Sequence, residues 1–195
     1  MSVAVNEMVH EKDALPGDLA IWFFIMAEML VFGVFFIVYV YVRSNNVELF
    51  NTYQLELHRV AGVINTIALI TSSYFVAMGV YAIKKNDVQR TGYMLLLALA
   101  MGAVFVAVKI WEYSHVFGAG IHLSTNYFYT FYISLTFFHF MHVLMGMVIL
   151  GALYYFLRQG KYSAEDHIGI ETGASYWHMV DLLWIVLFPL VYVIR

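Results

Sequence analysis

The sequence predicts an all-α integral membrane protein, a bundle of five transmembrane helices that forms one membrane domain over residues 1–195. Of its residues, 63% are hydrophobic and only 12% are charged, which is far more apolar than a soluble domain of this length. Short polar linkers such as Ser44–Arg59 separate the apolar runs and leave no room for a soluble domain. Five apolar runs are each long enough to cross a hydrocarbon core of ~30 Å: about 18–43, 60–83, 92–117, 127–157 and 173–194.

Composition also excludes several classes of function. The chain has no cysteine, so a disulfide framework, a thiolate metal site and a cysteine nucleophile are excluded. The sequence contains no basic patch of the kind that would indicate a nucleic-acid partner. Residues 1–17 form a polar N-terminal tail, and the apolar run that follows is too long for a signal-peptide core and lacks a basic leader. We therefore expect this run to be retained as the first span.

The distribution of Lys and Arg favours an orientation with the N-terminus inside and the C-terminus outside, because cytoplasmic loops carry the excess of positive charge. Lys109 lies inside the third apolar run and is therefore left out of the count of basic residues on the two sides. With this orientation, six basic residues lie inside (Lys12, Lys84, Lys85, Arg90, Arg158 and Lys161) and three lie outside (Arg43, Arg59 and Arg195).

Most of the runs carry local signals of their own. Pro16-Gly17-Asp18 provides a turn and then an acid at the positive end of the first helix. In the third run, Ala98 and Gly102 form a small-xxx-small face for close packing. Pro189 predicts a bend near the end of the fifth helix. The second run holds small polar residues, which in a bundle hydrogen-bond across helices or back to a carbonyl: Asn65, Thr66, Thr71, Ser72 and Ser73.

The last run, Tyr176–Ile194, contains Asp181 one helical turn after His178. A carboxylate at this depth costs about 2.5–3.5 kcal/mol on insertion scales, so it is kept where it faces a partner or a polar cavity. Glu28 lies about 15 Å into the first helix with apolar neighbours on both sides. Near the middle of the membrane, we expect Glu28 to carry its proton. It either handles protons inside the bundle or is a neutral acid hydrogen-bonded to a neighbouring helix.

His139 and His142 lie three residues apart, on one face of the fourth helix. They are either a haem or metal ligand pair, or packing and hydrogen-bonding groups, and the lack of a partner motif favours the second interpretation. Di-iron bundles need two Glu-x-x-His helices, whereas only Glu112-x-x-His115 lies in a span and Glu7-x-x-His10 lies in the polar tail. The sequence therefore predicts no metal site.

Depth in the membrane groups the remaining polar residues. Glu28, His142, His178 and Asp181 fall in the middle or inner half, and we expect them to form one polar cluster between the first, fourth and fifth helices. Near the outer end of the third helix, Lys109 and Glu112 are three residues apart, and His115 follows. An ion pair or contact with lipid headgroups at the outer side is the expectation for this second set.

Five motifs in order resemble subunit III of the haem-copper oxidases over nearly the whole chain. The first is Trp22 followed by Ala27-Glu28 and Phe32, similar to the family's span with a carbodiimide-reactive glutamate. The others are Asn65-Thr66 with Thr71-Ser72-Ser73, Glu112-Tyr113, the stretch Phe131–Gly146 with His139-x-x-His142, and Tyr176-Trp177-His178 with Val180-Asp181 and Trp184.

The chain also departs from the larger members of that family. Phe137 and Phe140 stand where the family has small residues, and the first two of seven helices are missing. Five-helix forms include a quinol-oxidase subunit and a branch associated with nitric oxide reductase. The opening Pro16–Trp22 and the ending Trp177–Trp184 with Leu187-Phe188-Pro189 resemble the nitric-oxide-reductase branch most.

The resemblance implies an accessory subunit in the bacterial inner membrane, without haem or copper of its own and without catalysis by this chain alone. It implies a catalytic partner subunit of a haem-copper oxidase or nitric oxide reductase that carries the haem and metal. The implied work is to stabilise that subunit, bind phospholipid and support proton uptake. Glu28 is then the central carboxylate, His139 or His142 its partner on the fourth helix, and His178 and Asp181 the contribution of the fifth.

Two rival functions remain from other classes. One is an independent proton-coupled transporter or channel whose site is formed by Glu28 and Asp181. Transporters usually contain internal repeats and helices broken near the middle of the membrane, and neither is evident in the sequence. The other is a haem-binding membrane enzyme that uses His139 and His142.

Overall fold

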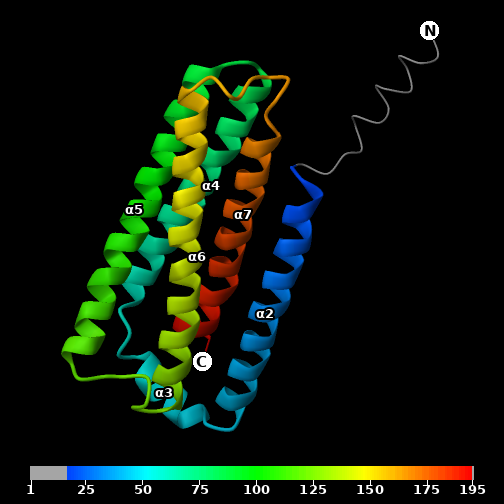
Figure 1. The fold of residues 1–195 in the computed structure, drawn as a ribbon. Helices are drawn as coiled ribbons and strands as arrows, with labels where there is room; N and C mark the ends of the chain where they lie inside the picture. The colour runs from blue at the N-terminus through cyan, green and yellow to red at the C-terminus, as the bar shows by residue number, and fades with distance from the viewer. Residues whose placement is uncertain (1–16, 195) are drawn as a thin grey trace.

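The computed structural model describes residues 17–194, and these form helices and short turns with no strand (Figure 1). Each of the five long helices, with the last span continuing to Val193, is long and apolar enough to cross a membrane. The predicted all-α architecture with five candidate spans is therefore confirmed. The helices are α2 (Leu19–Ser44), α4 (Arg59–Lys84), α5 (Val88–Gly118), α6 (Tyr127–Arg158) and α7 (Ile168–Phe188).

The linker after α2 is not a simple loop, because it contains the short helix α3 (Val47–Gln54). Phe50 of α3 is buried and makes an edge contact with Tyr39 of α2, with ring centroids 5.5 Å apart. Gln54 donates a hydrogen bond from Nε2 to the carbonyl oxygen of Val191 at 2.9 Å. Phe50 and Gln54 thus hold α3 against one end of the bundle. The polar character of the linker did not predict this helix.

The chain changes helix type at Pro189, where a bend was expected. A π-helical turn, η1 (Pro189–Val193), follows α7 directly. Proline cannot donate a backbone hydrogen bond, and in membrane helices local π-helical adjustments help to satisfy the backbone groups that proline leaves free. Tyr192 in this turn is completely buried. The change of helix type therefore accompanies a tyrosine that lies inside the bundle.

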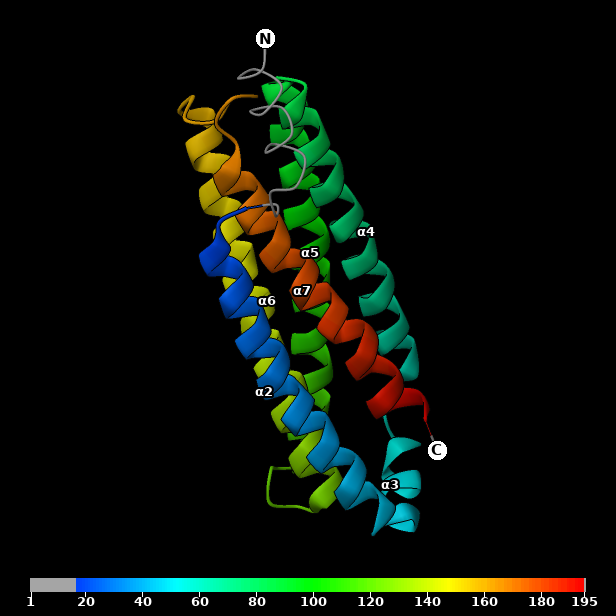
Figure 2. The ribbon, with the colours of Figure 1, turned by 90° about the vertical axis from the view of Figure 1, so that its right-hand side faces the viewer.

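Packing is uneven across the five helices. The most extensive contact is between α4 and α5, and α7 runs obliquely across the bundle and touches α2, α4 and α6 (Figures 1 and 2). In the most apolar stretch of the last span, 56% of the residues are buried inside the chain. In the corresponding stretch of α2, only 6% are buried. Only Phe32 and Tyr39 of α2 are buried. The first helix is therefore peripheral, with an apolar face that no other part of residues 17–194 covers.

Small residues permit the closest approaches between helices. A side chain at Gly146 of α6 would bring a Cβ atom to 2.7 Å from the ring of Trp177 on α7. On the small face of α5, Ser72 of α4 donates a hydrogen bond to the carbonyl oxygen of Ala98 at 2.8 Å. A Cβ at Gly102 would lie 3.2 Å from Trp177. Large aromatic side chains of α7 thus fill space that glycines on two other helices leave free.

Both ends of α2 are attached to the last span by hydrogen bonds. The backbone N–H of Gly17 donates to Oε2 of Glu171 at 3.2 Å, and the N–H of Asp18 donates to the Thr172 hydroxyl at 3.0 Å. At the other end, the Tyr39 hydroxyl donates to the carbonyl oxygen of Leu190 at 3.2 Å. The N-terminal face of the bundle is the end that contains Gly17 and loops 85–87 and 159–167. The C-terminal face is the opposite end, which contains α3 and loop 119–126.

Candidate functional site

Glu28 of α2 meets His142 of α6 within the membrane-spanning part of the bundle. The distance from Oε2 to Nε2 is 3.1 Å, and the side chains are 19% and 10% exposed. The rings of Phe32 and Phe138 lie 5.4 and 4.7 Å from the imidazole centroid. Aromatic rings thus pack beside the histidine, which turns its Nε2 edge to the carboxyl group.

The hydrogen bonds of His142 determine how many protons this pair holds. Nδ1 lies 2.8 Å from the carbonyl oxygen of Phe138, which can only accept, so Nδ1 carries a hydrogen. A hydrogen bond between Nε2 and Glu28 then needs one more proton, placed either on the carboxyl group or on the imidazole. With that proton the pair is neutral overall, either as acid and imidazole or as carboxylate and imidazolium. The geometry describes a site for one shared proton.

His178 and Asp181 of α7 do not join this pair. Nδ1 of His178 lies 2.5 Å from the hydroxyl of Ser73 on α4. Asp181 follows one helical turn later on α7, and its Oδ1 is buried without a hydrogen-bond partner in residues 17–194. No hydrogen bond or ion pair of the described residues joins His178 or Asp181 to Glu28 and His142, so the expected single cluster does not form: Glu28 pairs with His142, and His178 pairs with Ser73. The reason is rotation: the side chain of His178 is directed to α4 rather than to α6.

His139 lies on a different side of α6 from its neighbour. It is completely buried, and neither ring nitrogen has a hydrogen-bond partner within the described part of the chain. Its ring packs against Phe105 at 5.8 Å and Trp184 at 5.2 Å. His142, and not His139, is therefore the α6 partner of Glu28.

No group of three or more His, Asp or Glu side chains within residues 17–194 is arranged to hold a metal ion. The second Glu-x-x-His match, Glu7 to His10, lies outside the described residues, as do Lys12, Pro16 and Arg195.

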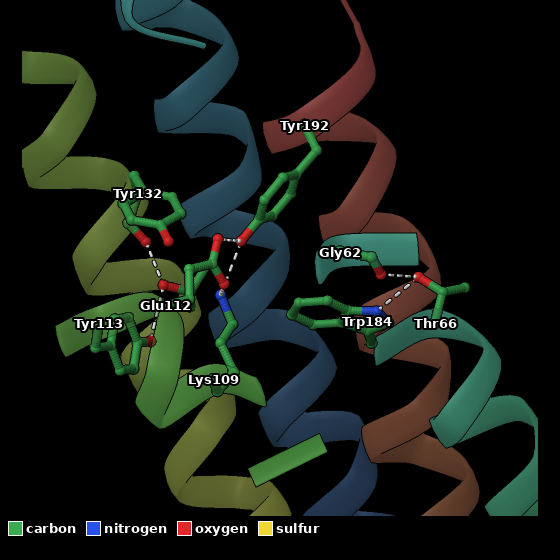
Figure 3. A network of polar contacts seen from close by, with 9 residues as sticks. Gly62, Thr66, Lys109, Glu112, Tyr113, Tyr132, Trp184 and Tyr192 are labelled. Carbon is green, nitrogen blue, oxygen red and sulfur yellow. Dashed lines mark hydrogen bonds and ion pairs between the residues drawn. The ribbon is translucent and has the colours of Figure 1, made fainter. Parts of the chain in front are cut away.

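Lys109 and Glu112 form an ion pair in the interior of the bundle (Figure 3). The ammonium group lies 2.8 Å from Oε2 of Glu112 and 2.8 Å from the hydroxyl of Tyr192, which in turn donates to Oε1 of Glu112 at 2.8 Å. Both charged side chains are almost completely inaccessible, at 0% and 1% exposure. The ion pair that the spacing suggested is thus present, and burial keeps Lys109 away from any lipid headgroup.

Aromatic rings surround this ion pair. The Lys109 ammonium lies between 5.2 and 5.4 Å from the ring centroids of Tyr113, Tyr132, Trp184 and Tyr192. Cation–π attraction of this kind is strongest where water is excluded, and it compensates part of the cost of burying charge. Sequence reasoning missed Tyr192 because the tyrosine lies 80 residues from Glu112. The only sequence signal for Tyr192 was its position just after Pro189 in the last span.

A second layer of hydrogen bonds lies beside the ion pair. The hydroxyl of Tyr113 donates to Thr136 of α6 at 2.9 Å, and Nε1 of Trp184 donates to Thr66 of α4 at 3.0 Å. The Thr66 hydroxyl itself donates to the carbonyl oxygen of Gly62 at 2.8 Å (Figure 3). These bonds join α5 to α6 and α7 to α4 beside the ion pair.

His115 lies apart from the ion pair, at the surface of the C-terminal face. Its Nδ1 bonds the carbonyl oxygen of Trp111 at 3.0 Å. It lines a cavity of about 280 Å³ together with Glu56, His58 and Glu112. His58 also lines an apolar groove of about 370 Å³ between α4 and α5. Of the three residues expected at the outer side, only His115 is exposed.

Comparison with known proteins accounts for the five motifs, from Trp22 to Trp184, that follow one another along the sequence. The family model described as cytochrome c oxidase subunit III matches residues 10–194. The chain belongs to the cytochrome c oxidase subunit III family. The resemblance to subunit III of the haem-copper oxidases is thereby confirmed.

Individual relatives agree with this assignment to subunit III. The chain is 37% identical to the cytochrome c oxidase subunit 3 of Thermostichus vulcanus over 172 residues, covering 88% of this chain and 84% of the relative. It is 30% identical to the probable cytochrome c oxidase subunit 3 of Nocardia farcinica, covering 98% and 95% of the two chains. A heme-copper oxidase subunit I+III of Aeropyrum pernix is 29% identical over 97% of this chain and 24% of its own length.

Proposed function

We propose that this chain is the accessory subunit of a haem-copper oxidase in the bacterial inner membrane, bound to a catalytic subunit I that holds the haem and metal. The observation that carries the proposal is the subunit III family match over residues 10–194. The relative whose name joins subunits I and III supports subunit I as the neighbour, since a fused chain keeps two partners together. The five apolar spans support the location.

The accessory role rests on the lightly packed first helix and on the interior polar pairs. Phe23, Leu30 and Ile37 of α2 are 68–71% exposed and form an apolar surface suited to lipid or to a partner subunit. The apolar groove between α4 and α5 suits a phospholipid chain, with His58 and His115 at the headgroup level. The one-proton pair Glu28–His142 supports proton uptake by the complex.

The charge distribution supports the N-in, C-out orientation for this accessory subunit. Among the described residues, the N-terminal face holds five basic side chains and the C-terminal face two. Cytoplasmic loops of membrane proteins carry such an excess. The five are Lys84, Lys85, Arg90, Arg158 and Lys161, and the two are Arg43 and Arg59.

A nitric oxide reductase complex is the second candidate for the assembly. Two stretches favour it, Pro16–Trp22 at the start and Trp177–Pro189 at the end, because both resemble the nitric-oxide-reductase branch. Identity of the reduced substrate separates the candidates: oxygen consumption by the isolated complex supports the oxidase, and nitric oxide consumption without oxygen consumption supports the reductase.

The test of the assembly is affinity purification of the tagged chain in mild detergent, with a visible spectrum of the product. We expect haem and a large catalytic subunit to co-purify, and the haem to leave when that subunit is stripped away. A colourless chain that elutes alone contradicts the accessory role and supports an independent proton-coupled transporter. A Soret band that stays with the stripped chain supports a haem site at His139 or His142 instead.

A further inference from the structure

A polar cavity opens at the C-terminal face, where the loop after α3 meets the end of α5. It has a volume of about 280 Å³. A single water molecule needs only about 10–15 Å³ of accessible space, so the cavity has room for a small organic group. No Lys or Arg of the described residues lines it. The polar lining consists of Glu56 and His58 from the loop, Glu112 and His115 from α5, and Tyr129 from α6.

The polar lining offers mainly hydrogen-bond acceptors. The hydroxyl of Tyr129 donates its hydrogen to Oε2 of Glu56 at 2.8 Å, and a carboxylate has no hydrogen to donate. Nδ1 of His115 lies 3.0 Å from the carbonyl oxygen of Trp111 and therefore carries a hydrogen, so Nε2 of the neutral imidazole is an acceptor. Neutral His58 has one acceptor nitrogen as well. A group that enters the cavity therefore has to supply donors.

The lining also carries a negative charge that no cation of the chain offsets. The carboxylate of Glu112 is paired with Lys109, and both side chains are buried. Glu56 is exposed, and none of the ion pairs among the described residues includes it. An anionic group in the cavity would be repelled by the Glu56 carboxylate, whereas a cation would be attracted.

An aromatic stack connects the cavity with the apolar groove between α4 and α5. The ring centroid of Trp111 lies 5.2 Å from that of His58 and 4.4 Å from that of His115. Trp111 and His58 also line the groove, which has a volume of about 370 Å³. Aromatic faces attract organic cations. An amphipathic cation is thus able to place its apolar part in the groove and its charged end in the cavity.

A primary ammonium group matches this lining better than other cations do. It has three N–H donors and a positive charge, which suit a carboxylate and neutral acceptors. A quaternary ammonium group has the charge but no N–H donor. For a metal ion, no group of three or more His, Asp or Glu side chains within residues 17–194 is suitably arranged. The acceptors and the open carboxylate therefore select an amine in its protonated form.

We propose that the cavity at the C-terminal face binds a primary ammonium group, with Glu56 as its charged acceptor and His115 as a neutral one. The ammonium group belongs either to the headgroup of an aminolipid whose chain lies in the groove, or to a soluble amine. The aminolipid source rests on the lipid role proposed above for the groove. The cavity itself goes beyond the accessory function, because it recognises a ligand with side chains of this chain alone.

The test measures binding of two kinds of amine to the purified complex. In phosphatidylcholine nanodiscs, n-butylammonium is titrated by calorimetry against its isomer tetramethylammonium, which has the same charge but no N–H donor. For the lipid source, phosphatidylethanolamine replaces part of the phosphatidylcholine. Native mass spectrometry then counts the phosphatidylethanolamine that the complex retains.

Three variants locate the binding. Glu56→Gln removes the charge but keeps the shape of the side chain, and His115→Phe removes the neutral acceptor but keeps a ring beside Trp111. Glu48→Gln is the matched control, because Glu48 is also an exposed glutamate of the C-terminal face but does not line the cavity. The haem spectrum shows that each variant complex is intact.

We expect Glu56→Gln to weaken binding of the amine by about fivefold, the upper range for an exposed pair of opposite charges. His115→Phe should weaken binding as well, and Glu48→Gln should match the wild-type chain. Retention of phosphatidylethanolamine without binding of butylammonium identifies the lipid source, and the reverse identifies a soluble amine.

Three results would overturn the proposal: equal binding of butylammonium and tetramethylammonium, equal binding by Glu56→Gln and Glu48→Gln, or no binding of either amine. The accessory role is judged separately, by co-purification of haem with the tagged chain. A chain that purifies alone can still be titrated with butylammonium, so failure of the accessory role and failure of the amine site give different results.

Discussion

The ammonium group of Lys109 on α5 and the hydroxyl of Tyr192 in the π-helical turn lie 2.8 Å apart in the interior of the bundle. This contact joins the third membrane helix to the last turn of the chain and gives the buried cation a second oxygen partner. The tyrosine also donates to Glu112, so one phenol group contacts both members of the ion pair. The C-terminal turn is therefore part of the polar core.

Tyr192→Phe tests the importance of this contact. The substitution keeps the ring but removes one acceptor for Lys109 and one donor to Glu112. An unsatisfied buried group costs about 1–3 kcal/mol, so thermal unfolding of the purified complex should begin at a lower temperature. Tyr93→Phe, at an exposed position, is the control. Identical unfolding of both variants would show that the phenol group adds nothing to stability.

Removal of one charge from the ion pair should be more damaging than removal of both. Lys109→Met leaves an unpaired buried carboxylate, and Glu112→Leu leaves an unpaired buried ammonium. Either single change is expected to cost about 3–5 kcal/mol, whereas the double variant should recover much of the loss. A double-mutant cycle on chemical unfolding of the complex measures the coupling. Additive losses in the double variant would contradict a direct interaction between the two groups.

Glu28→Gln should preserve the contact between α2 and α6, whereas Glu28→Leu should weaken it. The glutamine side chain is able to donate an N–H to Nε2 of His142, but leucine leaves that nitrogen without a partner. We expect the complex to be recovered at nearly wild-type yield with glutamine and at a lower yield with leucine. Equal recovery of both variants would be evidence against a role of the pair in holding α2.

The proton of the Glu28–His142 pair is open to a chemical test as well. Hydrophobic carbodiimides react with protonated acids in apolar surroundings, so Glu28 should be labelled in the membrane-embedded complex. Peptide mass spectrometry identifies the modified residue. Labelling restricted to the acids outside the long helices, Glu48, Glu56 and Glu165, would indicate that Glu28 lacks a proton or is inaccessible.

Gly17→Ala should loosen the start of α2. The backbone of Gly17 has a φ of +82°, a value that residues with a side chain rarely adopt. An added Cβ atom would lie 3.0 Å from the backbone of Thr172. Such a strained conformation costs about 1–3 kcal/mol. Faster hydrogen exchange in the first turns of α2 is the expected result. Gly33→Ala is the control, because a Cβ there has no neighbour within 4 Å and alanine favours a helix.

The amino-acid sequence by itself determined the membrane class, the five helical spans and the family. Span number follows from the length of apolar runs, since a chain in lipid must satisfy its own backbone hydrogen bonds. The spacing of Lys109 and Glu112 predicted their ion pair for a similar local reason, because residues three apart on a helix are neighbours. Motif order, from Glu28 to Asp181, was enough to indicate subunit III.

Only the tertiary structure decided which helix each polar face meets. Spacing along one helix says nothing of its rotation against its neighbours, so His178 was expected near Glu28 but lies beside Ser73 of α4. His139 and His142 share a stretch of α6, yet one faces the aromatic core and the other faces α2. Tyr192 meets Lys109 over 83 residues of chain because the π-helical turn and the packing of the bundle bring them together.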